Sequence, residues 1–209
     1  QNEQLEEFAS VVSHDLRNPL NIVEGRIELA RSECNTEHLD KARTALERAQ
    51  TLIDDLLTLA REGEKVDDTE DVDLADTVRE CWQTVDTSGA TLQTDADLTV
   101  RADPSRLRQL FENLVRNAVS HGGDDVTVHV GELDDGFYVE DDGYGIPEAD
   151  RDNVFEAGYS TSRDGSGFGL NIVEQIVDGH GWEIDATESP DGGARFEITG
   201  VSWRDGRVE

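Results

Sequence analysis

Apolar residues early in the chain follow the alternating three- and four-residue spacing of a coiled-coil seam. They are Leu39, Ala42, Leu46, Ala49, Ile53, Leu56 and Ala60. A second apolar stripe precedes them and consists of Leu5, Phe8, Val12, Leu16, Val23 and Ile27. The two stripes predict two long amphipathic helices joined by a short turn. A lone helical hairpin cannot cover both stripes, so we expect two copies of the chain to form a four-helix bundle. In the alternative, the stripes pack on the second half of the same chain.

His14 lies off the apolar stripe of the first predicted helix. It is about 200° from Val12 and about 160° from Leu16 around the helix, so its imidazole should face solvent or a partner. Pro19 has no N–H to bond the carbonyl of Asp15, and it should therefore bend the helix close to His14. By itself, this pattern also fits an ordinary surface histidine beside a kink.

Acidic residues outnumber basic residues by 48 to 18 among the 209 residues, which gives a net charge of −30. Such a charge argues against binding of nucleic acid, because the phosphates would repel the chain. The acidic residues are spread along the sequence and 35% of residues are hydrophobic, so we expect a folded protein. We interpret the charge as an adaptation to high salt, where cations screen the repulsion.

No apolar run approaches the ~18 residues of a membrane-spanning helix, so we expect no membrane segment in this chain and a cytoplasmic location. Cys34 and Cys81 are far apart in sequence and have neither metal-site nor disulfide-scaffold spacing. The chain starts with Gln and contains no Met. We therefore expect a fragment of a longer protein, with a sensor region upstream as one arrangement that would fit.

Residues 63–71 are charged and aperiodic, which predicts a linker between a first domain over residues 1–62 and a second over residues 72–209. In the second domain, helix and strand patterns alternate, which predicts an α/β sandwich. Asp73 and Asp103 are typical helix N-caps, and Pro104 suits the first position of a helix. The expected elements are helices at about 74–85, 104–121 and 168–179, a strand at 98–102, and strand hairpins within 126–140 and 183–201. The polar stretch at 144–167 predicts a lid or binding loop.

Asn113, Asn117 and His121 are four residues apart and so share one face of the predicted helix after Pro104. An amide carbonyl is a hard oxygen ligand that suits Mg²⁺, whose other ligands are usually waters and phosphates. The pattern therefore indicates a metal and phosphate site. Solvent-facing or capping asparagines are the alternative.

Two glycine-rich segments follow. In Asp141-Asp142-Gly143-Tyr144-Gly145-Ile146-Pro147, a carboxylate at a strand end can accept a hydrogen bond from an exocyclic amine, and the glycines let the backbone approach a planar ligand. A tight acidic turn is the alternative. Gly165-Ser166-Gly167-Phe168-Gly169-Leu170 opens a helix, and exposed N–H groups there can bind an anion. The polar loop before it and the lack of a Walker lysine exclude a Rossmann turn and a P-loop.

In their order and spacing, these motifs resemble those of the sensor histidine kinases of two-component signalling, over nearly the whole chain. The five matching segments are Ser13 to Leu20 (phosphoacceptor box), Asn113 to Ala118 (N box), Asp141 to Ile146 (first glycine box), Val154 to Glu156 (phenylalanine box) and Gly165 to Leu170 (second glycine box). The resemblance implies an α + α/β architecture. An antiparallel helical hairpin would form a dimeric four-helix bundle, and an α/β sandwich of the Bergerat (GHKL) ATP-binding fold would follow, as in gyrase, Hsp90 chaperones and MutL proteins.

The resemblance implies that His14 takes the γ-phosphoryl group of Mg·ATP and that the group then passes to an aspartate of a response-regulator receiver domain. Phosphoryl transfer depends on positioning and charge stabilisation. Asp15 would orient the imidazole and accept its other proton, which raises the nucleophilicity of the reacting nitrogen. Asn18, one helical turn after His14, would position the phosphate or a water.

The resemblance also assigns the cofactor residues. Asn117 would ligate Mg²⁺, Asn113 would support the metal and phosphates, and Asp141 would bind the adenine amino group, while His121 would line the nucleotide. The glycines would shape the adenine pocket (Gly143 and Gly145) and anchor the lid at the phosphates (Gly165, Gly167 and Gly169).

The sequence departs from the family pattern at two positions. Asp142 stands where the first glycine box usually has asparagine, and its charge should weaken nucleotide binding unless it is screened. Asp15 stands where many members have glutamate, and the shorter carboxylate can do the same chemistry. Two rival functions stay open: a Bergerat-type ATPase with Glu112 as its base, and a non-catalytic adaptor that presents the bundle to a receiver.

Overall fold

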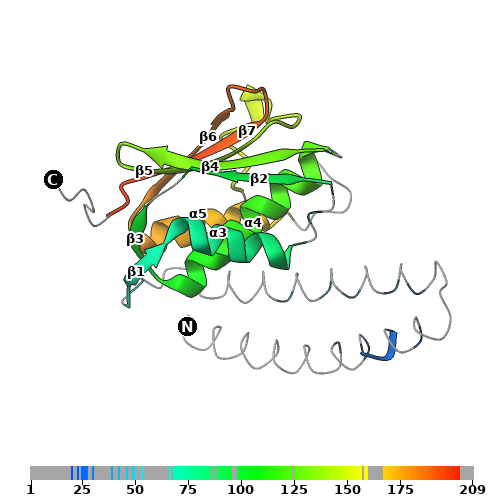
Figure 1. Cartoon of the computed structure of the whole chain (residues 1–209). Coiled ribbons are helices and arrows are strands. Elements are labelled where there is room, and N and C mark those ends of the chain that lie inside the picture. Colours follow the sequence, from blue (N-terminus) through cyan, green and yellow to red (C-terminus); the bar gives the residue numbers. More distant parts are fainter. Residues whose placement is uncertain are drawn as a thin grey trace. The chain divides into compact units, whose positions relative to one another are not determined.

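The computed structural model divides into two compact units, residues 1–62 and 63–209 (Figure 1). The structure describes residues 20, 23, 25–27, 30, 39, 42, 46, 49, 53, 66, 68–85, 87, 89–95, 98–123, 125–156, 158–159 and 167–202. All described residues of the first unit are helical, including the members Leu39 to Ile53 of the predicted coiled-coil seam. His14, Asp15 and Asn18 lie outside the described residues, and so does the predicted bend at Pro19.

The second unit is built around a five-stranded sheet with strand order β2-β4-β5-β7-β6. Its strands are β2 (Thr91–Thr94), β4 (Thr127–Leu133), β5 (Gly136–Asp141), β6 (Glu183–Glu188) and β7 (Ala194–Thr199). β2 runs parallel to β4, and the other neighbours are antiparallel. The helices α3 (Leu74–Thr84), α4 (Pro104–Gly122) and α5 (Gly169–His180) lie on one face of the sheet (Figure 1). A separate two-stranded sheet pairs β1 (Glu70–Asp73) with β3 (Thr99–Ala102).

The core lies between the sheet and the three helices. In β4, β5 and β7, alternate residues are buried, as expected when one face of a sheet is covered. Phe111 of α4 meets Phe137 of β5 with ring centroids 5.6 Å apart, and Trp182 packs edge-on against Phe137. The covered face therefore fixes the register of the strands, because a shift by one residue would expose these side chains.

Local signals in the sequence explain where two of the helices begin. The Asp73 carboxylate accepts the backbone N–H of Asp76 at 2.8 Å, and the Asp103 carboxylate accepts the N–H groups of Ser105 and Arg106. Both N-caps were predicted, as was Pro104 at the first helical position. α4 ends at Gly122, and the C-cap residue Gly123 has φ of +101°. The predicted hairpin within residues 126–140 is also confirmed, since β4 and β5 pair across the turn at Asp134-Asp135.

The sequence did not predict β1 or β2. β1 has the sequence EDVD, and acidic residues are depleted in strands, so its pairing with β3 overrides a poor local preference. It begins at Glu70, one residue before the predicted end of the linker. A short 3₁₀ helix, Glu148–Asp150, lies within the predicted loop at 144–167. None of the helices in the described part of the chain is long and apolar enough to cross a membrane.

Candidate functional site

The predicted polar face of α4 meets the start of α5. Asn113, Asn117 and His121 are all half-buried on this face. The Asn113 Nδ2 group donates to the carbonyl of Gln109 at 2.9 Å. Its Oδ1 atom points toward α5, because a Cβ atom on Gly169 would lie only 3.2 Å from it. The structure thus brings together the N box and the described end of the second glycine box.

Asp141 is the last residue of β5, and only 7% of it is exposed. Its Oδ1 atom accepts the backbone N–H groups of Gly143, at 2.9 Å, and Ala194, at 3.2 Å. Burial raises the pKa of this carboxyl group, and the charge of Asp142 adds to the rise. The two N–H bonds and the nearby His121 act in the opposite direction. Asp141 is therefore a buried acceptor whose orientation is fixed by backbone groups on both sides.

Glycines let the backbone close around Asp141. A Cβ atom on Gly143 would overlap the Cα atom of Gly122, so the end of α4 touches the turn that follows β5. A Cβ atom on Gly193 would overlap the carbonyl oxygen of Asp141. Gly145 has φ of +68°, a conformation that side chains disfavour. Any larger residue at these positions would displace the segments that surround the carboxylate.

The described ends of the predicted lid are tied to the rest of the unit. The N–H of Gly158 donates to the carbonyl of Gly167 at 2.9 Å, and the Asn171 side chain donates to the carbonyl of Phe155, also at 2.9 Å. Phe155, of the phenylalanine box, is buried and packs edge-on against Phe196 of β7. Gly165 lies outside the described residues. Gly167 and Gly169 thus lie at the junction of this loop with α5.

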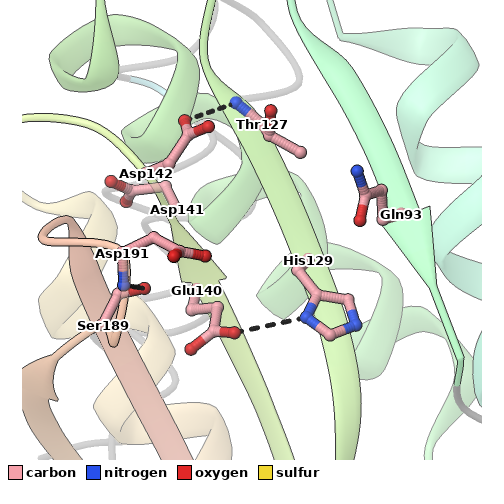
Figure 2. A pocket seen from close by; sticks show the side chains of 8 residues that line it. All are labelled: Gln93, Thr127, His129, Glu140, Asp141, Asp142, Ser189 and Asp191. Atoms are coloured by element: carbon pink, nitrogen blue, oxygen red, sulfur yellow. Dashed lines mark hydrogen bonds and ion pairs between the residues drawn. The ribbon is translucent and has the colours of Figure 1, made fainter.

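Asp142 is exposed, and its carboxylate is bound to the beginning of β4. Its Oδ1 atom accepts the backbone N–H of Thr127 at 2.7 Å, and its own N–H donates to the Thr127 carbonyl (Figure 2). The carboxylate that replaces the usual asparagine therefore has a hydrogen-bond partner in the fold. Its charge still acts on the site, because it helps to raise the pKa of Asp141.

A polar hollow lies beside Asp141 and Asp142 (Figure 2). Its lining residues are Gln93, Thr127, His129, Glu140, Asp141, Asp142, Ser189 and Asp191. It includes neither of the α4 asparagines, so it is not the predicted phosphate site. Within the described part of the chain, no group of three or more histidine, cysteine or acidic side chains could hold a metal ion.

Sequence reasoning missed Gly193 and Ala194, whose backbones contact Asp141. The segment Pro190-Asp191-Gly192-Gly193 lies within the predicted hairpin at 183–201, and a hairpin pattern predicts only a turn there. The only signal in the sequence for this contact is the second glycine of the turn, Gly193. Its φ is not in the left-handed region, so the turn itself does not require glycine at this position.

Three features together define the class of this protein. They are a mixed sheet covered by helices on one face, a buried carboxylate at a strand end, and a helix face with two asparagines beside a glycine-rich turn. The second unit is an α/β ATP-binding domain of the GHKL fold, preceded by a helical hairpin domain. The model of the family "Histidine kinase-, DNA gyrase B-, and HSP90-like ATPase" matches residues 102–200. The model of the "His Kinase A (phospho-acceptor) domain" matches residues 4–65.

Relatives of known class share both regions. Sensor histidine kinase ZraS of Klebsiella oxytoca is 33% identical over 207 residues, which cover 90% of this chain and 44% of ZraS. Phytochrome-like protein Cph1 of Synechocystis is 31% identical over 215 residues, covering 93% of this chain and 29% of Cph1. The crystal structure of full-length ShkA in complex with AMPPNP matches with a TM-score of 0.68 at 28% identity, covering 95% of this chain and 46% of that one.

The chain belongs to the histidine kinases of two-component signalling, and its two domains are those of a protein-histidine kinase that uses ATP. It spans less than half the length of ZraS and of Cph1.

Proposed function

We propose that this chain autophosphorylates on His14 with Mg·ATP and then passes the phosphoryl group to an aspartate of a response-regulator receiver domain. One observation supports this most: the buried Asp141 carboxylate and the Asn113 carbonyl oxygen lie in one ATP-binding domain, downstream of a matched phosphoacceptor region that contains His14. A purine base and a phosphate chain can then be held by the same unit that follows the acceptor histidine.

In this proposal, the Asp141 carboxylate accepts a hydrogen bond from the adenine amino group. Its Oδ1 atom already serves two backbone donors, so Oδ2 is the atom available for the base. Gly143 and Gly145 allow the close backbone approach that a planar base needs. His121 lies near enough to act on the charge of Asp141, which supports a place beside the nucleotide.

Asn117 would ligate Mg²⁺, and Asn113 would support the metal and the phosphates. Both side chains offer amide oxygens, which are hard ligands, and the Asn113 oxygen is directed away from its own helix toward α5. When bound, the ion would neutralise charge on the phosphate oxygens. Gly165, Gly167 and Gly169 would carry the lid over the phosphates, with N–H groups at the start of α5 facing the anion.

The reaction at His14 would form a bond from an imidazole nitrogen to the γ-phosphorus while the bond to the ADP oxygen breaks. Asp15 would accept the proton from the other ring nitrogen, and Asn18 would help to position the phosphate. The resulting phosphoramidate would then be the donor for the receiver aspartate.

We also propose a homodimer, because a hairpin leaves apolar faces that a second copy can cover. Val23, on the first predicted stripe, is 46% exposed in the single chain. The net charge of −30 supports an adaptation to high salt and argues against nucleic acid as a partner. The thermal unfolding temperature should then rise steeply with KCl concentration; equal stability in dilute buffer would contradict the adaptation.

The test is labelling of the chain with [γ-³²P]ATP. We expect acid-labile, alkali-stable label in the wild type and in His38→Gln, a matched histidine substitution in the same predicted domain. His14→Gln should take up none. Label that survives the loss of His14 would refute the assignment.

A Bergerat-type ATPase with Glu112 as its base finds no support in the geometry. Glu112 acts on the thiol of Cys81 in α3: burial first, and then the charge of Glu112, raise the pKa of that thiol to about 12. Release of phosphate without any phosphoprotein would favour this rival.

A further inference from the structure

An ion-pair network lies on the sheet face opposite the helices, around Arg195 of β7. Its Nη1 atom is 2.8 Å from Glu140 Oε2, and its Nε atom is 2.6 Å from Glu197 Oε1. The guanidinium lies over the ring of Tyr138, 3.7 Å from the ring centroid. The side chains of Arg195 and Glu140 are only 15% and 11% exposed. Because water is largely excluded, this pair holds its geometry better than a surface ion pair does.

This pair lies at the end of the β5–β7 ladder. Glu140 and Arg195 form the last pair in the register of the two strands; Asp141 directly follows Glu140, and Ala194 directly precedes Arg195. Beyond this last pair, the two strands are joined by the bond from the Ala194 N–H to Asp141 Oδ1. The ion pair therefore holds the ends of β5 and β7 together at the position next to the Asp141 carboxylate.

Little room exists for the strand end to move. Gly193, just before Ala194, packs so closely on Asp141 that a Cβ atom there would overlap its carbonyl oxygen. A splay of β7 away from β5 would lengthen the Ala194 bond first, because Ala194 belongs to β7, whereas Gly143 follows Asp141 in the turn after β5. The carboxylate would then be oriented by Gly143 alone.

We propose that Arg195 is a positioning residue: its pair with Glu140 holds β7 so that the Ala194 N–H orients the Asp141 carboxylate for the base. The inference rests on the proposed role of Asp141 as the adenine acceptor. Arg195 does not touch the nucleotide in this account. It therefore affects recognition of the base and leaves phosphoryl transfer unchanged.

β5 keeps other anchors when Arg195 is replaced. Glu140 Oε1 lies 3.2 Å from Nδ1 of His129 on β4, and Asp142 is bound to Thr127 of the same strand. Loss of the arginine thus frees β7 from β5 at one point without releasing β5 from β4. A variant that folds and yet recognises the base poorly is the expected result.

The experiment compares binding of MgATP and MgITP to the full chain at high salt, together with autophosphorylation rates. Inosine carries a 6-oxo group in place of the 6-amino group, so it lacks the 6-amino donor that the proposal assigns to Asp141. The wild type should prefer ATP. In Arg195→Gln, we expect this preference to fall by about tenfold, as when one oriented hydrogen bond weakens. The preference should fall because ATP binds more weakly, while ITP affinity and the autophosphorylation rate at saturating ATP stay unchanged.

Two further variants separate positioning from stability. Arg195→Gln leaves the charges of Glu140 and Glu197 without their arginine. Glu140→Gln with Arg195→Gln also removes the less exposed of these two charges and should recover part of the thermal stability. The double variant should nevertheless keep the reduced preference. Arg108→Gln is the matched control, since it removes an exposed 2.9 Å pair with Glu80 that has no link to Asp141. Its preference should equal that of the wild type.

An unchanged ATP preference in Arg195→Gln would overturn the inference, and so would a double variant that regains the preference along with stability. A wild type that does not distinguish ATP from ITP would instead overturn the proposed role of Asp141 itself. The two failures are thus distinguishable.

Discussion

Replacement of Asp141 by asparagine should reverse the preference of this chain for adenine without unfolding it. The Gly143 and Ala194 N–H groups both require an acceptor, so the amide oxygen must take the place of Oδ1. The amide NH₂ group then occupies the place of Oδ2 and faces the adenine amino group. A donor meets a donor, and a buried hydrogen bond is lost.

The magnitude follows from the burial of the site. A hydrogen bond to a charged group contributes about 1.5–3 kcal/mol, and a buried donor left unpaired costs about 1–3 kcal/mol. Only 7% of Asp141 is exposed, so neither loss is compensated fully by water. We expect a total near 3–4 kcal/mol, which is about 10²- to 10³-fold in ATP affinity.

The same substitution should not lower the thermal stability of the chain, although it weakens ATP binding. Burial raises the pKa of Asp141, so the folded state binds the proton more tightly than the unfolded state does. This group therefore lowers stability as the pH rises from its ordinary value through the raised one. Asp141→Asn removes that loss, and its unfolding temperature at neutral pH should equal or exceed that of the wild type.

The assay is calorimetric titration with MgATP and with MgITP, with Asp185→Asn, an exposed position on β6, as the control. The asparagine NH₂ can donate to the 6-oxo group of inosine, so Asp141→Asn should prefer ITP. Wild-type ATP affinity in this variant would refute the assigned role of Asp141. So would an equal loss of affinity for both nucleotides in a folded variant.

Asn117→Ala should abolish the effect of Mg²⁺ on ATP affinity and reduce His14 labelling by at least about 10²-fold, as measured by titration with and without EDTA; an intact Mg²⁺ effect would contradict the ligand assignment. Asp142→Asn keeps the bond to the Thr127 N–H but removes a charge that raises the pKa of Asp141. ATP affinity should rise about two- to fivefold at low salt and less at high salt; no change at low salt would show that the charge is already screened. Burial lowers the pKa of His180, so stability should fall as the pH drops below its ordinary value of 6.5. Unfolding curves across pH 5–8 should show this slope in the wild type and a weaker slope in His180→Gln, and equal slopes would contradict it.

Features with a local cause could be predicted from the sequence. Asp73 and Asp103 cap the helices that follow them because an N-cap needs only its own side chain and the next turn of backbone. The polar face of α4 follows from helix periodicity alone. The strands β1 and β2 could not be predicted, because each has four residues and is stabilised by partners far along the chain.

The same distinction holds within the candidate site. Asp141 and the glycines after it form one continuous motif, whereas Gly193 and Ala194 reach Asp141 only through the pairing of β5 with β7. The Arg195 network has no local signature either, since Glu140 and Arg195 are 55 residues apart. The sequence predicts that the charge of Asp142 weakens nucleotide binding, but it does not predict the bond to Thr127, which depends on the register of β4 with β5.

The central claim is that His14 receives the γ-phosphoryl group of ATP. The most direct measurement is peptide mass spectrometry of the chain at alkaline pH after incubation with MgATP at high salt. The account predicts one phosphate, on the peptide that contains His14, which disappears after brief acid treatment. Phosphate on any other residue, or ADP formation without phosphoprotein, would contradict it.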